Sequence, residues 1–154
     1  MLLIKIKIIY RGGLMKLIRL SKLGNEEIGF LSFLESNKDI PFEIKRIYYV
    51  YDVPINTKRG MHAHKELNQF LWCPYGIIKV VIDNGCEKKE FLLDSPEKGL
   101  LVGKGIWHEM YWLKENSVLC VAASDYYNEK DYIRDYDEFL KLVKEGYWKD
   151  ENKF

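Results

Sequence analysis

The sequence lacks the features that mark membrane, secreted or repeat proteins. No apolar run reaches the roughly 18 residues that a membrane-spanning helix needs. The apolar start, MLLIKIKIIYRGG, is interrupted by lysines and has no small-residue cleavage site, so we do not expect a signal peptide. There is also no internal repeat, no low-complexity segment and no linker rich in Pro, Gly or Ser. We therefore predict one domain over residues 15–154, preceded by a leader or extra strand over residues 1–14.

The net charge is small and cysteine is scarce. The 24 basic and 23 acidic residues leave a net charge of +1, which excludes a long-range field that would attract a nucleic acid polymer or an anionic membrane. Three cysteines form no CxxC pair, and an odd number without a secretion signal predicts reduced thiols in a cytoplasm. Aromatic residues are plentiful at 14%. They suit β-strands, and they also stack on sugars and bases.

Short runs of β-branched and aromatic residues recur between turn residues, as in RIYYVYDV, NQFLWC, IIKVVIDNG and SVLCVAAS. Each run has the length of a strand, which predicts an all-β sandwich or barrel. The DNG sequence at residues 83–85 predicts a hairpin, because both of its central positions tolerate positive φ.

Only the tail has the period of a helix. Four apolar residues recur there at helical spacing: Tyr136, Phe139, Leu140 and Val143. Asp135 with Glu138 resembles a capping box, and Gly146 supplies a helix stop. We predict a short C-terminal helix that packs on the outside of the sheet and has no part in function.

The segment RGMHAHKELNQFLWCPYG contains two of the three histidines of the chain. On a strand, residues two apart face the same side, so His62 and His64 project together and Ala63 faces away. This pair indicates a metal site, a metal-free acid/base site or packed core histidines.

The spacing around these histidines resembles the first cupin motif. His62 and His64 form its HxH, Gln69 stands where the motif has glutamate, and Gly76 closes it, whereas Gly60 is displaced from the position of the first glycine. GKGIWH resembles the second motif, with His108 as its histidine. The resemblance implies a cupin-type β-barrel, or jelly roll, with a C-terminal α-helix.

Within the cupins, RGMHAHKELNQ, GKGIWH and YNEKDYIRDYDEF resemble the WxcM-like sugar-nucleotide 3,4-ketoisomerases over nearly the whole chain. The resemblance implies an isomerase that moves the keto group of dTDP-4-keto-6-deoxy-D-glucose from C4 to C3 through an enediolate. It implies no cofactor, a homodimer with exchanged N-terminal strands, and a pathway to 3-amino or 3-acetamido sugars of surface glycans.

The resemblance also implies a catalytic role for His62 as base, with His64 orienting the base or the sugar. Histidine suits a base at cytoplasmic pH. Tyr48 is the candidate proton shuttle, although strand alternation leaves Tyr49 and Tyr51 open, since either face of the strand can be the inner one.

Arg46 and Arg59 are candidate ligands of the pyrophosphate, because a guanidinium presents a fork of donors. Gln69 is a neutral amide that can hydrogen-bond a histidine or a sugar hydroxyl. We expect His108 to line the same barrel mouth, with a purely structural role as its alternative.

The glutamine in place of a carboxylate favours a metal-free site, although three histidines alone can hold zinc. The rival interpretations are a metal-dependent cupin enzyme and a cupin that binds a sugar nucleotide without turnover.

Overall fold

The structure, a computed structural model, describes residues 9–10 and 13–149 and confirms the predicted all-β fold. The strands are β1 (Ile9–Tyr10), β2 (Gly13–Arg19), β3 (Ser21–Asn25), β4 (Gly29–Phe33), β5 (Arg46–Val50), β6 (Lys58–His64), β7 (Gln69–Tyr75), β8 (Ile78–Asp83), β9 (Lys88–Leu93), β10 (Lys98–Val102), β11 (Trp107–Trp112), β12 (Val118–Ala123) and β13 (Tyr132–Ile133). A 3₁₀ turn η1 (Glu129–Asp131) and one helix α1 (Tyr136–Glu145) complete the elements. No helix in the described part of the chain is long and apolar enough to cross a membrane.

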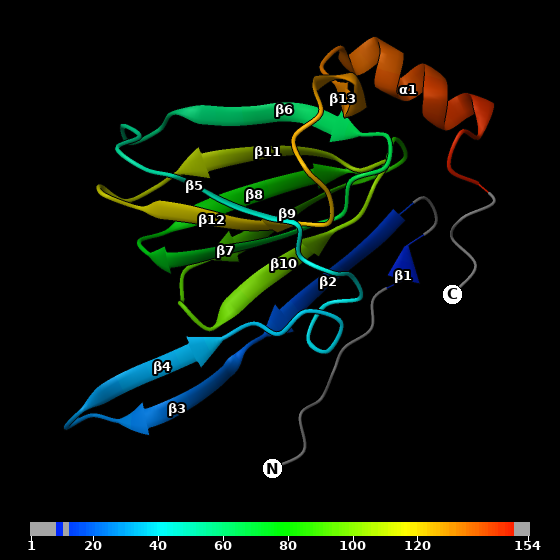
Figure 1. The fold of residues 1–154 in the computed structure, drawn as a ribbon. Helices are drawn as coiled ribbons and strands as arrows, with labels where there is room; N and C mark the ends of the chain where they lie inside the picture. The colour runs from blue at the N-terminus through cyan, green and yellow to red at the C-terminus, as the bar shows by residue number, and fades with distance from the viewer. Residues whose placement is uncertain (1–8, 11–12, 150–154) are drawn as a thin grey trace.

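Two antiparallel sheets form the body of the molecule (Figure 1). One has the strand order β1-β2-β10-β7-β12-β5 and the other β13-β6-β11-β8-β9. A single apolar core joins their inner faces, with Leu71 and Val121 from the first sheet packed with Val80 and Trp112 from the second. This is the jelly-roll arrangement that the cupin resemblance implies, with two facing sheets rather than one closed ring of strands.

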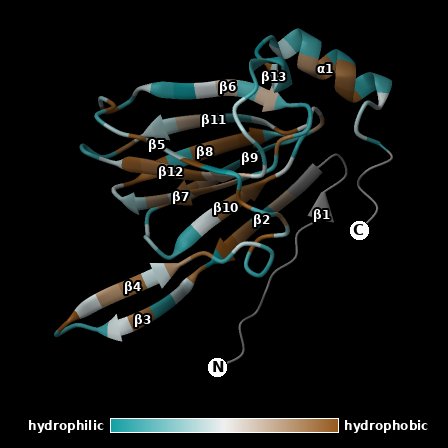
Figure 2. Cartoon of the chain, viewed as in Figure 1, coloured by the Kyte–Doolittle hydropathy of each residue, from teal (hydrophilic) through white to brown (hydrophobic). Residues whose placement is uncertain are grey.

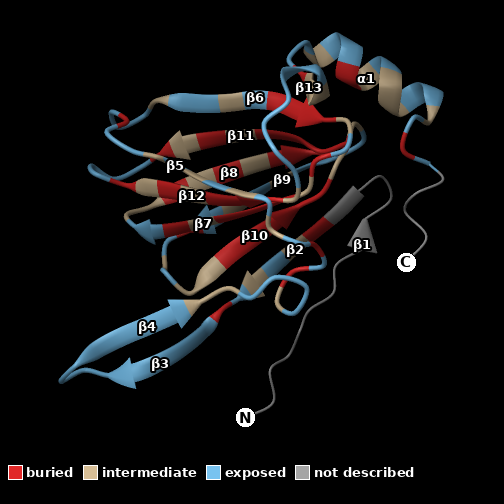
Figure 3. Ribbon diagram, viewed as in Figure 1, coloured by how far each residue is buried: buried red, intermediate tan, exposed pale blue. Residues whose placement is uncertain are grey.

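Strand alternation decides which side chains enter this core. β8 alternates buried and half-buried residues along most of its length, and its apolar colour in Figure 2 matches its buried colour in Figure 3. β6 differs, because its first half is polar and exposed and its last three residues are buried. The buried part holds His62, Ala63 and His64, so the histidines lie inside the protein although their strand begins at the surface.

The predicted helix packs against one end of the outer face of the five-stranded sheet, beside β6 and β13. Asp135 accepts a hydrogen bond from the Glu138 N–H, and Gly146 ends the helix in the left-handed conformation. Phe139 is fully buried against Trp107 and Ala63. Both the helix and its caps are therefore confirmed, and Ala63 faces away from the two histidines, as expected.

The predicted hairpin is also confirmed, but its turn is longer than two residues. Asp83 pairs with Lys88, which leaves a loop of residues 84–87. Only Gly85 in it has a positive φ. Asn84 instead accepts hydrogen bonds from the N–H groups of Cys86 and Glu87, so its side chain organises the loop rather than its backbone.

A second hairpin, β3–β4, stands away from the two sheets (Figure 1) and is exposed along nearly all of its length (Figure 3). Its apolar side chains Leu23, Ile28, Phe30 and Leu31 are more than half exposed. At the other end of β2, Ile9 and Tyr10 pair with Leu14 and Gly13. Most of the predicted leader lies outside the described residues, and its boundary at residue 15 stays a prediction.

Candidate active site

Three histidines from two neighbouring strands meet on the inner face of the five-stranded sheet. His62 and His108 are paired across β6 and β11, with ring centroids 4.5 Å apart, and the His64 ring lies 4.9 Å from that of His62. All three are buried, with exposed fractions of 9%, 2% and 1% for His62, His64 and His108. The sequence predicted the first two to project together, and the structure brings the third to them.

Hydrogen bonds show which ring nitrogen carries a proton in two of these histidines. His108 Nδ1 lies 3.2 Å from the Ile106 carbonyl oxygen and His64 Nδ1 lies 2.9 Å from Asp131 Oδ2. Both partners are acceptors, so each Nδ1 carries the proton. Among the described residues, both ring nitrogens of His62 and the Nε2 of His64 have no hydrogen-bond partner. Buried polar atoms normally have one, so these nitrogens are available to a ligand.

Burial favours the neutral form of His62 and His108. Desolvation first, and the neighbouring His64 second, lower the pKa of His62 from 6.5 to about 4. Desolvation also holds the pKa of His108 well below its usual value. Histidine suits a base at cytoplasmic pH because its ordinary pKa is near neutral, and the buried position makes the pKa of His62 lower than that. At neutral pH the ring is therefore in the unprotonated form that can accept a proton.

A tyrosine and the glutamine form a second polar group on the facing sheet. Tyr48 lies on the inner face of β5, whereas Tyr49 and Tyr51 are exposed, which resolves the alternatives left open by the sequence. Gln69 Nε2 donates to the Tyr48 hydroxyl over 2.8 Å. Burial raises the pKa of Tyr48 to about 12, so its O–H keeps its proton. Gln69 Oε1 is buried without a partner among the described residues.

The two predicted arginines face the same interior. Arg46 lies over the rings of Tyr48 and Tyr127, and its buried Nε has no partner among the described residues. Arg59 is exposed but pairs with Met110 of the core, so both side chains project to one side. Neither guanidinium forms an ion pair with a described carboxylate, which leaves both free to bind an anion.

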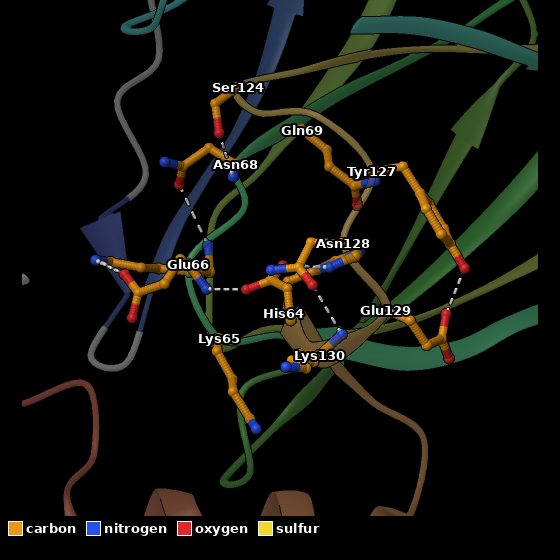
Figure 4. A network of polar contacts seen from close by, with 12 residues as sticks. His64, Lys65, Glu66, Asn68, Gln69, Ser124, Tyr127, Asn128, Glu129 and Lys130 are labelled. Carbon is orange, nitrogen blue, oxygen red and sulfur yellow. Dashed lines mark hydrogen bonds and ion pairs between the residues drawn. The ribbon is translucent and has the colours of Figure 1, made fainter. Parts of the chain in front are cut away.

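One wall of the site was not predicted from the sequence. Residues 124–134 run beside His64 and Gln69 (Figure 4). The Tyr132 ring centroid lies 4.9 Å from that of His62 and 4.4 Å from that of His64, and the Arg134 guanidinium lies over the Tyr132 ring. Glu129 binds Arg134 through two oxygens. This segment contains a two-residue strand and one 3₁₀ turn, which are too short to produce a hydrophobic period.

The histidine cluster also has a shape that suits a metal ion. One ring nitrogen of each histidine lies within 4.8 Å of the others, and three histidines form a common catalytic zinc site. The nearby amide of Gln69 is a weaker ligand than the carboxylate of the cupin motif. Because three histidines and an amide are a weaker set of ligands than three histidines and a carboxylate, a metal-free site stays our prediction.

The facing sheets and the polar groups of their inner faces define a cupin-type protein with a buried cluster of three histidines. A family model described as FdtA, WxcM-like, C-terminal, matches residues 14–144, and the chain belongs to that family.

Relatives of known activity agree with this assignment. The TDP-4-oxo-6-deoxy-alpha-D-glucose-3,4-oxoisomerase of Aneurinibacillus thermoaerophilus is 50% identical over 115 residues, which is 75% of this chain and 83% of the relative. A 3,4-ketoisomerase from Helicobacter canadensis is 45% identical, with a TM-score of 0.80 over 84% of this chain and 97% of that one. A histidine-to-asparagine variant of the 3,4-ketoisomerase from Thermoanaerobacterium thermosaccharolyticum, solved with TDP-4-keto-6-deoxyglucose, is 37% identical, with a TM-score of 0.84 over 92% of this chain and 99% of that one.

Proposed function

We propose that this chain is a sugar-nucleotide 3,4-ketoisomerase that converts dTDP-4-keto-6-deoxy-D-glucose to its 3-keto isomer. The observation that carries the proposal is the buried cluster of three histidines, two of which offer ring nitrogens without a partner in the described residues. Moving a carbonyl between adjacent carbons requires removal of a proton from C3, formation of an enediolate and protonation at C4. Acid/base groups suffice for these steps, and no redox cofactor enters the balance.

We assign the base to His62. Its ring is neutral at physiological pH, its two nitrogens have no hydrogen-bond partner among the described residues, and it packs against the rings of His64, His108 and Tyr132. His64 orients the base or the sugar. Tyr48 keeps its proton and receives a hydrogen bond from Gln69 at its oxygen, so its O–H is free to donate to the oxygens of the enediolate and to shuttle a proton between them.

Arg46 and Arg59 bind the pyrophosphate in this proposal. Both guanidinium groups face the interior side of the sheets without a described carboxylate partner. Gln69 and His108 line the sugar pocket, the first through its free Oε1 and the second through the buried ring beside His62. The relative solved with a TDP-linked keto sugar supports a ligand of this class.

Turnover of dTDP-4-keto-6-deoxyglucose, followed by NMR of the product, tests the proposal. His62→Asn should lower the rate by about a hundred- to ten-thousand-fold through loss of the general base, while dTDP binding and the unfolding curve persist. His64→Asn should have a milder effect, and Tyr49→Phe, on the exposed face of the same strand as Tyr48, should have none. No product from the wild-type protein would instead support a cupin that only binds the sugar nucleotide.

The compact histidine cluster also supports a second candidate, a metal-dependent cupin enzyme. Elemental analysis of the purified protein separates the two. One metal per chain, with activity lost in chelator and restored by that metal, would favour this second function over the metal-free one.

We further propose a homodimer with exchanged N-terminal strands. The β3–β4 hairpin projects from the body of the chain, and four of its apolar residues are each more than half exposed: Leu23, Ile28 (82%), Phe30 and Leu31. Exposed apolar surface on a projecting hairpin favours burial against a second copy. Light scattering after size-exclusion chromatography should give twice the mass of 18.3 kDa.

The proposed product also fits a place in a pathway. A 3-keto sugar is the substrate that a 3-aminotransferase needs, and an acetyltransferase then forms a 3-acetamido-3,6-dideoxyhexose for lipopolysaccharide or another surface glycan. Sugar nucleotides are made in the cytoplasm, where the three free cysteines of this chain would remain reduced.

A further inference from the structure

Asp131 is a carboxylate that connects the histidine cluster to the backbone, and the site as described above gives it no task. Its Oδ2 lies 2.9 Å from His64 Nδ1, and its Oδ1 accepts a hydrogen bond of 2.8 Å from the Glu66 N–H. The Leu67 N–H also contributes to holding this carboxylate. The side chain is 14% exposed, so water has little access to it.

The backbone around Asp131 is fixed on both sides. Its carbonyl oxygen accepts from the Lys65 N–H over 2.9 Å, and Tyr132, the next residue, is paired with His64 in the sheet. Asp131 N–H in turn donates to the Asn128 carbonyl. The backbone of Asp131 is therefore held beside β6, and its carboxylate can turn away from His64 only by also losing the hydrogen bond from the Glu66 N–H.

These bonds determine the protonation of His64. Although burial raises it, the hydrogen bonds from His64 and the Glu66 N–H lower the pKa of Asp131 overall. An ionised carboxylate can only accept hydrogen bonds, so His64 Nδ1 carries a proton, and in the neutral form of the ring Nε2 is then bare. Nε2 is buried and has no partner among the described residues.

We propose that Asp131 is a positioning residue that locks His64 in the Nδ1–H tautomer, with its bare Nε2 presented to the substrate as the acceptor of the hydroxyl proton. This assigns the transfer of the hydroxyl proton to His64 in place of Tyr48 and leaves Tyr48 to donate a hydrogen bond to the enediolate oxygens. It rests on the proposed isomerase function. The O–H bond at C3 breaks as an N–H bond forms at Nε2, and that bond breaks as the O–H bond at C4 forms. The hydrogen on C3 moves to C4 through His62, so protons and electrons balance without an oxidant.

The tautomer is measurable without substrate. The chain has only three histidines, so a long-range proton–nitrogen NMR spectrum of the ¹⁵N-labelled protein contains three ring systems. The missing signals of His62→Asn and His108→Asn then identify His64. The wild-type spectrum should show His64 protonated at Nδ1 and bare at Nε2. A proton on Nε2 in the free wild-type protein would overturn the proposal, whatever the enzyme turns over.

Asp131→Asn reverses the tautomer by a specific route. The backbone N–H groups of Glu66 and Leu67 require an acceptor, so the amide oxygen must face them and the NH₂ group must face His64. His64 Nδ1 then accepts, and the proton moves to Nε2. An Asp→Asn change that traps the wrong tautomer is also severe in the serine-protease triad.

In Asp131→Asn the NMR signal of His64 should shift to the Nε2–H tautomer, kcat should fall by about a hundredfold or more, and KM should change little. Asp125→Asn is the matched control, because it removes a carboxylate from the same segment at an exposed position whose hydrogen bond is to its own neighbour's N–H. It should alter neither tautomer nor kcat. An Asp131→Asn enzyme that keeps the wild-type tautomer or near-normal kcat would overturn the proposal. Absence of wild-type turnover would refute the isomerase function and leave the tautomer result to decide the role of Asp131.

Discussion

Acid should destabilise this fold through His62. Its ring is 9% exposed and its two nitrogens have no partner in the described residues. Burial and the neighbouring His64 lower its pKa from 6.5 to about 4 in the folded state. Between these two values the unfolded chain binds a proton that the folded protein excludes. Stability is therefore lost as the pH falls below 6.5, and the loss is complete once the pH is below 4.

The size of this loss follows from the two pKa values. Relative to pH 8, proton linkage to His62 should remove about 1.4 kcal/mol of unfolding free energy at pH 5.5 and about 2.5 kcal/mol at pH 4.5. His108 acts in the same direction, since its pKa is also lowered by burial. The contribution of His62 must therefore be measured as a difference between two proteins.

Urea unfolding of the wild type and His62→Asn at a series of pH values isolates the contribution of His62 to the pH dependence of stability. The unfolding free energy of the wild type, relative to that of His62→Asn, should fall by about 2.5 kcal/mol between pH 8 and pH 4.5. The reason is that the variant has no His62 to take up a proton on unfolding. Tyr49→Phe, on the exposed face of β5, should follow the wild type throughout. Parallel curves for the wild type and His62→Asn would refute the reasoning, since they would mean that His62 titrates alike in both states.

Three further outcomes are expected. Because Gln69 replaces the carboxylate of the cupin motif, activity should survive chelator, and loss restored by one metal would contradict this. dTDP at one hundred times its Kd should stabilise the folded protein by about 2.7 kcal/mol and so raise its melting temperature. Arg46→Ala and Arg59→Ala should make this rise smaller. A rise equal to that of the wild type in both variants would show that these arginines do not bind the nucleotide. Phe139→Ala should cost about 3–5 kcal/mol in urea unfolding, because this side chain is fully buried between helix and sheet, and a cost below 1 kcal/mol would contradict that packing.

The sequence predicted those parts of the fold that depend on local periods and turn chemistry. The helix with its caps at Asp135 and Gly146, and the shared face of His62 and His64, follow from spacing along one element. The inner face of β5 does not, because RIYYVYD alternates residues that suit either environment, and only pairing with β12 places Tyr48 inside.

The contacts of Asp131 were beyond sequence reasoning for a different physical reason. It lies 67 residues from His64, in a segment whose only strand is two residues long. No period reveals so short an element, and its place depends on pairing with β6 after the rest of the sheet has formed. An acidic residue in a polar stretch is ordinarily a solvated one, and nothing local distinguishes Asp131 from Asp125.

A bulge in β6 places both chemical functions of the site on one strand. Arg59 lies three residues before His62, so on a regular strand the two would face opposite sides. Gly60 pairs with Glu109 and His62 with His108, which leaves Met61 as an extra residue, with φ values of 85° and 57° at Gly60 and Met61. Such a bulge re-aims the side chains on one side of it.

The bulge turns Arg59 to the face of Met110 and the histidines, yet leaves it exposed while His62 stays buried. This separation matters for the chemistry. A pyrophosphate beside His62 would favour the imidazolium and raise its pKa, which would consume the base. An arginine at the exposed end of the same strand can hold the anion in water, while the buried end keeps the ring neutral to accept the proton of the sugar.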